Sequence, residues 1–137
     1  MNSDVINSIY SYFIERPEVV AVYIFGSYAK GKERRNSDID LGILLKDKFK
    51  SNENEYHRTY LLGLTKRLRM DFHLVSMNNA GEGILSQIFK YGECIVDNVP
   101  DDLIRFKMIK YSMIADFSYQ KKMMEKGFIE NLFRVDR

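Results

Sequence analysis

The chain has 137 residues, of which 21 are basic and 19 acidic, so its formal net charge is +2. This length suits a buried core, and we expect a single domain over residues 1–137. The near-neutral balance argues against direct binding of long nucleic acids. Cys94 is the only cysteine and cannot form an internal disulfide bond, and the sequence shows no secretion signal and no membrane-spanning apolar run. We therefore expect a cytoplasmic protein without nucleic-acid or membrane contacts.

A helix followed by a buried strand is predicted at the start of the chain. Apolar residues recur on one helical face, and Pro17 would mark the end of this helix. These residues are Val5, Ile6, Ile9, Tyr10 and Phe13. Residues 19–25 (VVAVYIF) are continuously apolar and rich in β-branched and aromatic side chains, which is typical of a strand buried on both faces.

Gly26 and Ser27 come directly after this strand, and a short helix is expected to follow them. A glycine lets the backbone approach a ligand closely, and a serine at a helix N-terminus offers a hydroxyl and a backbone N–H to an anion. Lys30 belongs to a basic run that either attracts a triphosphate or is simply solvated. Ser37 either binds the same ligand or only forms the turn of the loop.

The next predicted strand, residues 38–45 (DIDLGILL), alternates between polar and apolar positions. The carboxylates of Asp38 and Asp40 therefore point to the same face, and residues two apart on a strand are separated by roughly 6.5 to 7 Å. Two hard oxygen ligands without a nearby thiol or imidazole favour Mg²⁺ or Mn²⁺. The alternative is that both are solvent-facing side chains of a half-exposed strand.

The middle of the chain is predicted to contain a loop, two helices and two strands. The polar residues Lys46 to Asn54 would form the loop, and Asp71 would lie on a strand with its side chain on the face opposite Phe72 and on the same face as His73. His73 either approaches a substrate or is packed or solvated. One helix spans Glu53 to about Arg67 with Tyr60, Leu61, Leu64 and Leu68 inward, and the next spans about Gly83 to Tyr91 with Ile84, Leu85, Ile88 and Phe89 apolar.

A long helix is predicted to begin at Pro100 and to reach about Glu125, because Gly127 is a plausible stop. Its apolar residues cover more than one face, so something must bury the excess. Packing across the sheet is the simpler explanation for the first half. For the second half, an interface with another copy or another protein is equally consistent with the sequence.

The spacing Gly26-Ser27, ten residues, Asp38-Ile-Asp40 resembles the signature of the DNA polymerase β-type nucleotidyltransferases. The text GSYAKGKERRNSDIDLGILL is similar to the minimal nucleotidyltransferases (MNT) within that superfamily. The resemblance implies an α/β (α+β) nucleotidyltransferase fold, in which a mixed four- to five-stranded sheet is flanked by helices and followed by a long C-terminal helix.

The same resemblance implies roles for individual residues. Asp38, Asp40 and Asp71 would be the catalytic carboxylates and would hold Mg²⁺ or Mn²⁺. The residues expected to bind ATP are Gly26, Ser27, Lys30 and Ser37. Lys30 stands where relatives carry arginine, which keeps the charge but loses the bidentate geometry of a guanidinium group.

Minimal nucleotidyltransferases typically pair with a helical HEPN-domain toxin, and the resemblance implies the antitoxin half of such a toxin–antitoxin module. The implied activity is transfer of AMP from ATP to a tyrosine hydroxyl of the toxin. One alternative is a non-catalytic subunit that binds nucleotide or the partner. Another is a small-molecule nucleotidyltransferase like the aminoglycoside-modifying enzymes, although these carry an additional helical domain.

Overall fold

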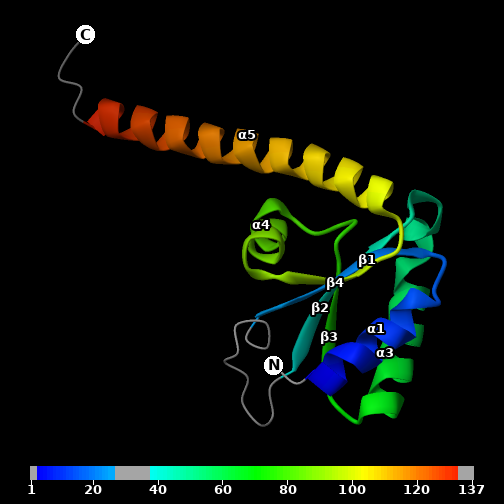
Figure 1. The fold of residues 1–137 in the computed structure, drawn as a ribbon. Coiled ribbons are helices and arrows are strands. Elements are labelled where there is room, and N and C mark those ends of the chain that lie inside the picture. The colour runs from blue at the N-terminus through cyan, green and yellow to red at the C-terminus, as the bar shows by residue number, and fades with distance from the viewer. Residues whose placement is uncertain (1–2, 27–37, 133–137) are drawn as a thin grey trace.

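The structure is a computed structural model, and it describes residues 3–26 and 38–132 (Figure 1). In this part of the chain, four strands form one sheet in the order β3-β2-β1-β4. Strand β1 is antiparallel to both of its neighbours, and β2 and β3 are parallel, so the sheet is mixed as expected. The strands span Val19–Phe25 (β1), Ile39–Leu45 (β2), Phe72–Ser76 (β3) and Glu93–Asp97 (β4).

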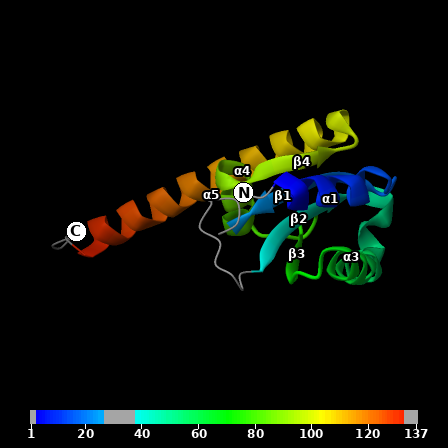
Figure 2. The ribbon, with the colours of Figure 1, turned by 60° about the horizontal axis from the view of Figure 1, so that its bottom comes forward.

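Helices cover both faces of this sheet (Figures 1 and 2). Helices α1 (Ser3–Ile14) and α3 (Glu53–Leu68) cover one face, whereas α4 (Glu82–Tyr91) and the beginning of α5 (Pro100–Leu132) cover the other. Each predicted helix and strand in the described residues is therefore present, and Pro100 opens the long helix as expected. No helix in the described ranges combines the length and apolar character that a membrane span requires.

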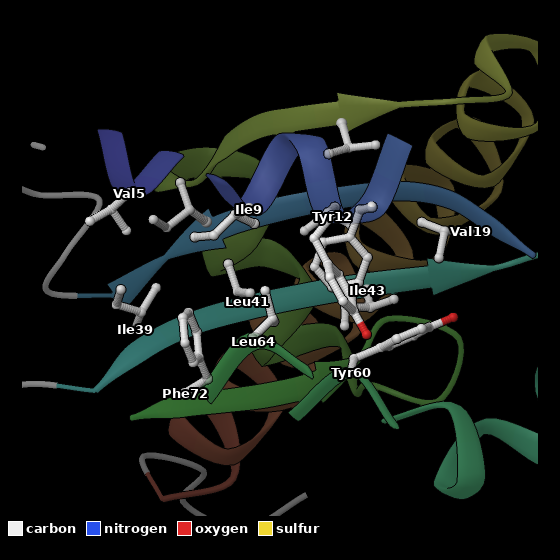
Figure 3. Packing of buried hydrophobic residues seen from close by; sticks show 14 of the residues in the cluster. Val5, Ile9, Tyr12, Val19, Ile39, Leu41, Ile43, Tyr60, Leu64 and Phe72 are labelled. Atoms are coloured by element: carbon white, nitrogen blue, oxygen red, sulfur yellow. The ribbon is translucent and has the colours of Figure 1, made fainter. Parts of the chain in front are cut away.

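The core consists of two apolar layers that are separated by the sheet. From Ala21 to Phe25 successive residues of β1 alternate between the two layers, whereas Val20 and Ala21 share one layer at a register irregularity. The strand is therefore buried on both faces, as predicted. The layer beneath α1 and α3 is shown in Figure 3 and includes Ile9, Phe13, Val22, Ile24, Ile39, Leu41, Ile43, Tyr60, Leu64 and Phe72. The layer beneath α4 and α5 includes Val20, Ala21, Tyr23, Leu44, Met77, Leu85, Ile88 and Leu103.

The buried faces of the helices are narrower than the sequence pattern predicts. Leu61 was expected to point inward and Tyr10 to lie on the apolar face of the first helix, but they are 39% and 43% exposed, and the apolar Ile84 is 46% exposed. In α1, Tyr12 is buried in place of Tyr10. The reason is that each helix contacts only one face of the sheet, so apolar side chains at the edge of its stripe stay partly in solvent.

Two segment boundaries also differ from expectation. The predicted loop after β2 contains a 3₁₀ helix, η1 (Asp47–Asn52), which leads directly into α3. Local contacts hold η1, because the Phe49 N–H donates to the carbonyl of Lys46 at 2.9 Å and the Phe49 ring packs on Tyr56. Helix α5 continues past Gly127 to Leu132, since a glycine within a helix costs only about 1 kcal/mol and does not by itself end it.

Candidate active site at the beginning of β2 and β3

The three candidate carboxylates lie at one end of the sheet. Asp40 is the second residue of β2, whereas Asp38 and Asp71 come immediately before β2 and β3. The register pairs Ile39 with Phe72, and the Ile39 N–H donates to the carbonyl of Asp71 at 3.0 Å. Because neighbouring strands are about 4.8 Å apart, this pairing places Asp38 next to Asp71 at adjoining strand ends.

All three carboxylates belong to the face of the sheet that α4 covers farther along. Ile39 and Phe72 point into the opposite layer, below α1 and α3 (Figure 3), so the residues on either side of them in the chain point away from it. Gly42 confirms this direction, because a β-carbon there would lie 3.2 Å from the Ile88 side chain of α4. Helix α4 therefore closes over Gly42, and the carboxylates lie beyond its cover.

Gly26 lies directly against Asp40. Its φ angle is +74°, which side chains other than glycine rarely adopt. A β-carbon at this position would overlap the Oδ2 atom of Asp40 and lie 3.1 Å from its Cγ atom. Position 26 therefore requires glycine for two independent reasons, its backbone conformation and its contact with the Asp40 carboxylate.

On its other side, Asp40 contacts His73, its register partner on β3. The Nδ1 atom of His73 lies 3.0 Å from the Oδ1 atom of Asp40, and the two side chains are 64% and 26% exposed. The sequence left the role of His73 open between substrate contact, packing and solvation. The contact follows from the parallel pairing of β2 with β3. No local pattern in the sequence indicates that pairing, so the sequence alone could not predict the contact.

The carboxylates do not form a complete metal centre by themselves. Among residues 3–26 and 38–132, no three His, Cys, Asp or Glu side chains are grouped closely enough to hold an ion as they are placed. The sequence-based choice of metal assumed no imidazole near the aspartates, which is wrong, because His73 contacts Asp40. The chemistry of the donors nevertheless fits Mg²⁺ or Mn²⁺, because carboxylate oxygens dominate. The candidate ATP-binding residues Ser27, Lys30 and Ser37 lie outside the described residues.

Two other features are separate from the aspartates. A surface cavity of about 190 Å³ is lined by Leu44, Lys46 and Arg105, among others, and so lies at the far end of β2. Cys94 lies on β4, where burial and the charge of Asp97 raise the pKa of its thiol. A raised pKa disfavours the thiolate, so Cys94 is a poor nucleophile.

Comparison with known proteins identifies relatives of this chain. A curated relative, the protein adenylyltransferase MntA of Shewanella oneidensis, is 30% identical over 86 residues, which cover 63% of this chain and 60% of the relative. This matched segment thus spans less than two thirds of the relative's length. The pattern of the family "Polymerase beta, Nucleotidyltransferase" matches residues 7–101, which include all the candidate site residues.

Solved structures share the fold. A chain from a toxin–antitoxin complex with AMP-PNP superimposes with a TM-score of 0.67 at 23% identity, covering 94% of this chain and 99% of that chain. A chain from the tri-AMPylated Shewanella oneidensis HEPN toxin in complex with its MNT antitoxin gives a TM-score of 0.64 at 21% identity, with the same coverage. Together with the family match over most of the sequence, the mixed sheet and its flanking helices show that this chain belongs to the polymerase β nucleotidyltransferase family.

Proposed function

We propose that this chain is a protein adenylyltransferase that moves AMP from ATP to a tyrosine hydroxyl of a HEPN toxin, and so acts as its antitoxin. The observation that carries the proposal is the position of Asp38, Asp40 and Asp71 at the same end of the neighbouring strands β2 and β3, with Gly26 against Asp40. The relative named as a protein adenylyltransferase and the structures named as toxin–antitoxin complexes support the choice of acceptor.

In the proposed reaction, the acceptor oxygen attacks the α-phosphorus of ATP and forms a new O–P bond. The bond from that phosphorus to the β-phosphate oxygen breaks, and pyrophosphate leaves. Asp71 accepts the proton of the hydroxyl, while Asp38 and Asp40 hold Mg²⁺ or Mn²⁺. A cation held by these carboxylates would neutralise phosphate charge and stabilise the attacking and leaving oxygens.

Gly26 and the residues after it would hold the triphosphate. A strand end followed by glycine leaves backbone N–H groups free to approach phosphate oxygens, because no side chain stands in the way. Ser27 would add its hydroxyl, and Lys30 and Ser37 would contact the phosphates from the same loop. We further infer that the chain is one domain and acts in the cytoplasm, where a lone cysteine such as Cys94 stays reduced.

The decisive experiment incubates the purified chain with its helical partner protein, Mg²⁺ and ATP labelled at either the α- or the γ-phosphorus. Label on the partner from α-labelled ATP alone is the expected result, since only AMP transfer retains the α-phosphorus. Label from γ-labelled ATP would indicate a kinase and would contradict the proposal. Replacing the acceptor tyrosine, located by mass spectrometry, should remove the label.

A matched pair of variants assigns the activity to this site. Asp40→Asn should abolish labelling without unfolding the chain, because it removes a charge outside the core. Asp47→Asn makes the same chemical change on η1, beyond the end of β2 that is opposite to the candidate site. The Asp47 carboxylate is 93% exposed, so this variant should leave labelling unchanged. Full labelling by Asp40→Asn would show that the activity lies elsewhere. Nucleotide binding without labelling by the unaltered chain would support the non-catalytic alternative instead.

A further inference from the structure

Helix α5 buries one apolar face and exposes apolar side chains over the rest of its surface, among them Ile109 and Met113. Leu103, Phe106 and Ile114 face the protein body and pack in the layer beneath α4 and α5. A second stripe, which we call the outer stripe, consists of Ile104, Met108, Tyr111, Ala115 and Tyr119. All five are exposed, and Ile104, Met108 and Tyr119 are 56%, 67% and 65% exposed.

The spacing of the outer stripe is that of a helix–helix seam. Successive members are four, three, four and four residues apart, the pattern that keeps side chains on one side of a helix. At about 100° per residue, the five side chains fall within an arc of about 80°, and Tyr111 forms the edge of this arc nearest the face that packs on the body. Figures 1 and 2 show α5 extending past the sheet and α4. Within the stripe, Tyr111 also contacts the body, because its ring lies 5.0 Å from that of Phe89 on α4, centroid to centroid.

Opposite charges terminate this stripe at its two ends. Asp101 lies three residues before Ile104, and Lys122 lies three residues after Tyr119, and both are exposed. Along the helix the order is therefore acidic, apolar, basic. The positions of these residues, but not their charges, are symmetric about the point between Tyr111 and Ser112. Only an antiparallel arrangement of two such stripes brings unlike charges together.

We propose that α5 binds a second copy of this chain in an antiparallel, two-fold symmetric helix pair. In this register Ile104 faces Tyr119 of the second copy, and Met108 faces Ala115, so that a large side chain meets a small one. Asp101 then faces Lys122 of the second copy at both ends. A two-fold interface of this kind is closed and self-complementary, which limits the assembly to a dimer.

The flank of the stripe carries the same complementarity. Arg105 and Asp116 lie on the same side of the outer stripe, about 20° apart around the helix axis. Both are exposed, and the 71% exposed Arg105 side chain also lies 3.7 Å from the Asp102 carboxylate of its own helix. In the antiparallel register each lies within two positions of the other on the second copy. A parallel pair would instead oppose like charges at Asp101 and at Lys122, which costs stability.

Measurement of the molar mass in solution tests the proposal first. Light scattering coupled to size exclusion should give twice the chain mass at micromolar concentration, and Met108→Glu should give the mass of one chain. Met108 is 67% exposed, so this variant should keep its circular dichroism spectrum and unfolding midpoint. A single-chain mass for the unaltered protein would overturn the proposal.

Charge exchange tests the register. Asp101→Lys and Lys122→Asp should each weaken the dimer, because each opposes like charges at both ends. Mixing the two variants in equal amounts should restore the dimer, since each charge again faces its opposite. Mixed variants that stay as monomers would refute the antiparallel register.

Cross-linking locates the symmetry axis. In a Cys94→Ser background, Tyr111→Cys should form an intermolecular disulfide bond on mild oxidation, because position 111 lies next to the two-fold axis. Lys126→Cys, at the far end of the stripe, is the control and should not cross-link to itself. If the chain is monomeric and Met108→Glu instead stops co-purification with the helical partner, the outer stripe belongs to that partner and the dimer is refuted.

Discussion

The imidazole of His73 on β3 contacts the carboxylate of Asp40 on β2, with 3.0 Å between Nδ1 and Oδ1. Gly26 occupies the other side of the same carboxylate. Asp40 is thus fixed between two strands, and this fixation is what the proposed chemistry requires, because a metal-binding carboxylate works best when its orientation is set by neighbouring groups.

His73→Phe is therefore expected to lower the rate of AMP transfer, by about 10- to 100-fold, as is usual for groups that orient a ligand. Asn in place of His73 should recover part of the rate, because its amide can donate to Asp40. The measurement is kcat and KM for both variants, together with Mn²⁺ affinity by calorimetry. Equal Mn²⁺ affinity and equal rates in all three proteins would show that the contact has no role in the site.

Gly26→Ala is expected to abolish transfer and to destabilise the fold by about 1–2 kcal/mol, the cost of a side chain in the left-handed region. The added methyl group would also push the Asp40 carboxylate out of place. Gly83→Ala is the control, since its β-carbon meets nothing within 4 Å, and in helix α4 it should stabilise by about 0.5–1 kcal/mol. For both variants, urea unfolding measures the change in stability and the labelling assay measures AMP transfer. A fully active Gly26→Ala protein would contradict the close contact.

Arg69→Gly is expected to stabilise the protein, by up to about 1 kcal/mol, because Arg69 ends α3 with a φ of +52° that glycine adopts without strain. Arg67→Gly, in the last turn of the same helix, should have the opposite sign and cost about 1 kcal/mol. Urea unfolding of both variants measures these changes in the free energy of unfolding. Destabilisation by Arg69→Gly would mean that the arginine side chain contributes more than its backbone costs.

The fold should become less stable as the pH falls below about 6.5, the usual pKa of histidine, through His57. Burial lowers the pKa of His57, so between its folded and unfolded pKa values the unfolded chain binds the extra proton. The contribution of neutral His57 to the free energy of unfolding is therefore fully present above about pH 6.5, and it is lost as the pH falls through the pKa of His57 in the folded chain. The free energy of unfolding from pH 7.5 to 5 should fall less in His57→Gln than in the unaltered chain. Parallel curves would exclude His57 as the cause.

The sequence predicted the secondary structure well wherever local patterns were strong. The continuous apolar run of β1, the alternation in β2 and Pro100 at the start of α5 each depend on neighbouring residues alone. The errors came where the environment decides, as in η1, which is held by contacts with α3, and in Tyr10, which lies outside the narrow stripe that α1 buries.

For the site, the sequence alone was enough to predict that Asp38 and Asp40 share a face and that a glycine follows β1, because both depend on spacing along one strand. The parallel pairing of β3 with β2 became known only from the three-dimensional fold, and it places Asp71 beside Asp38 at the strand ends and His73 against Asp40. The fold also shows that the outer stripe of α5 stays exposed while the face toward the body is buried. Strand order and the choice between helix faces depend on contacts between residues far apart in the chain, and no local pattern encodes them.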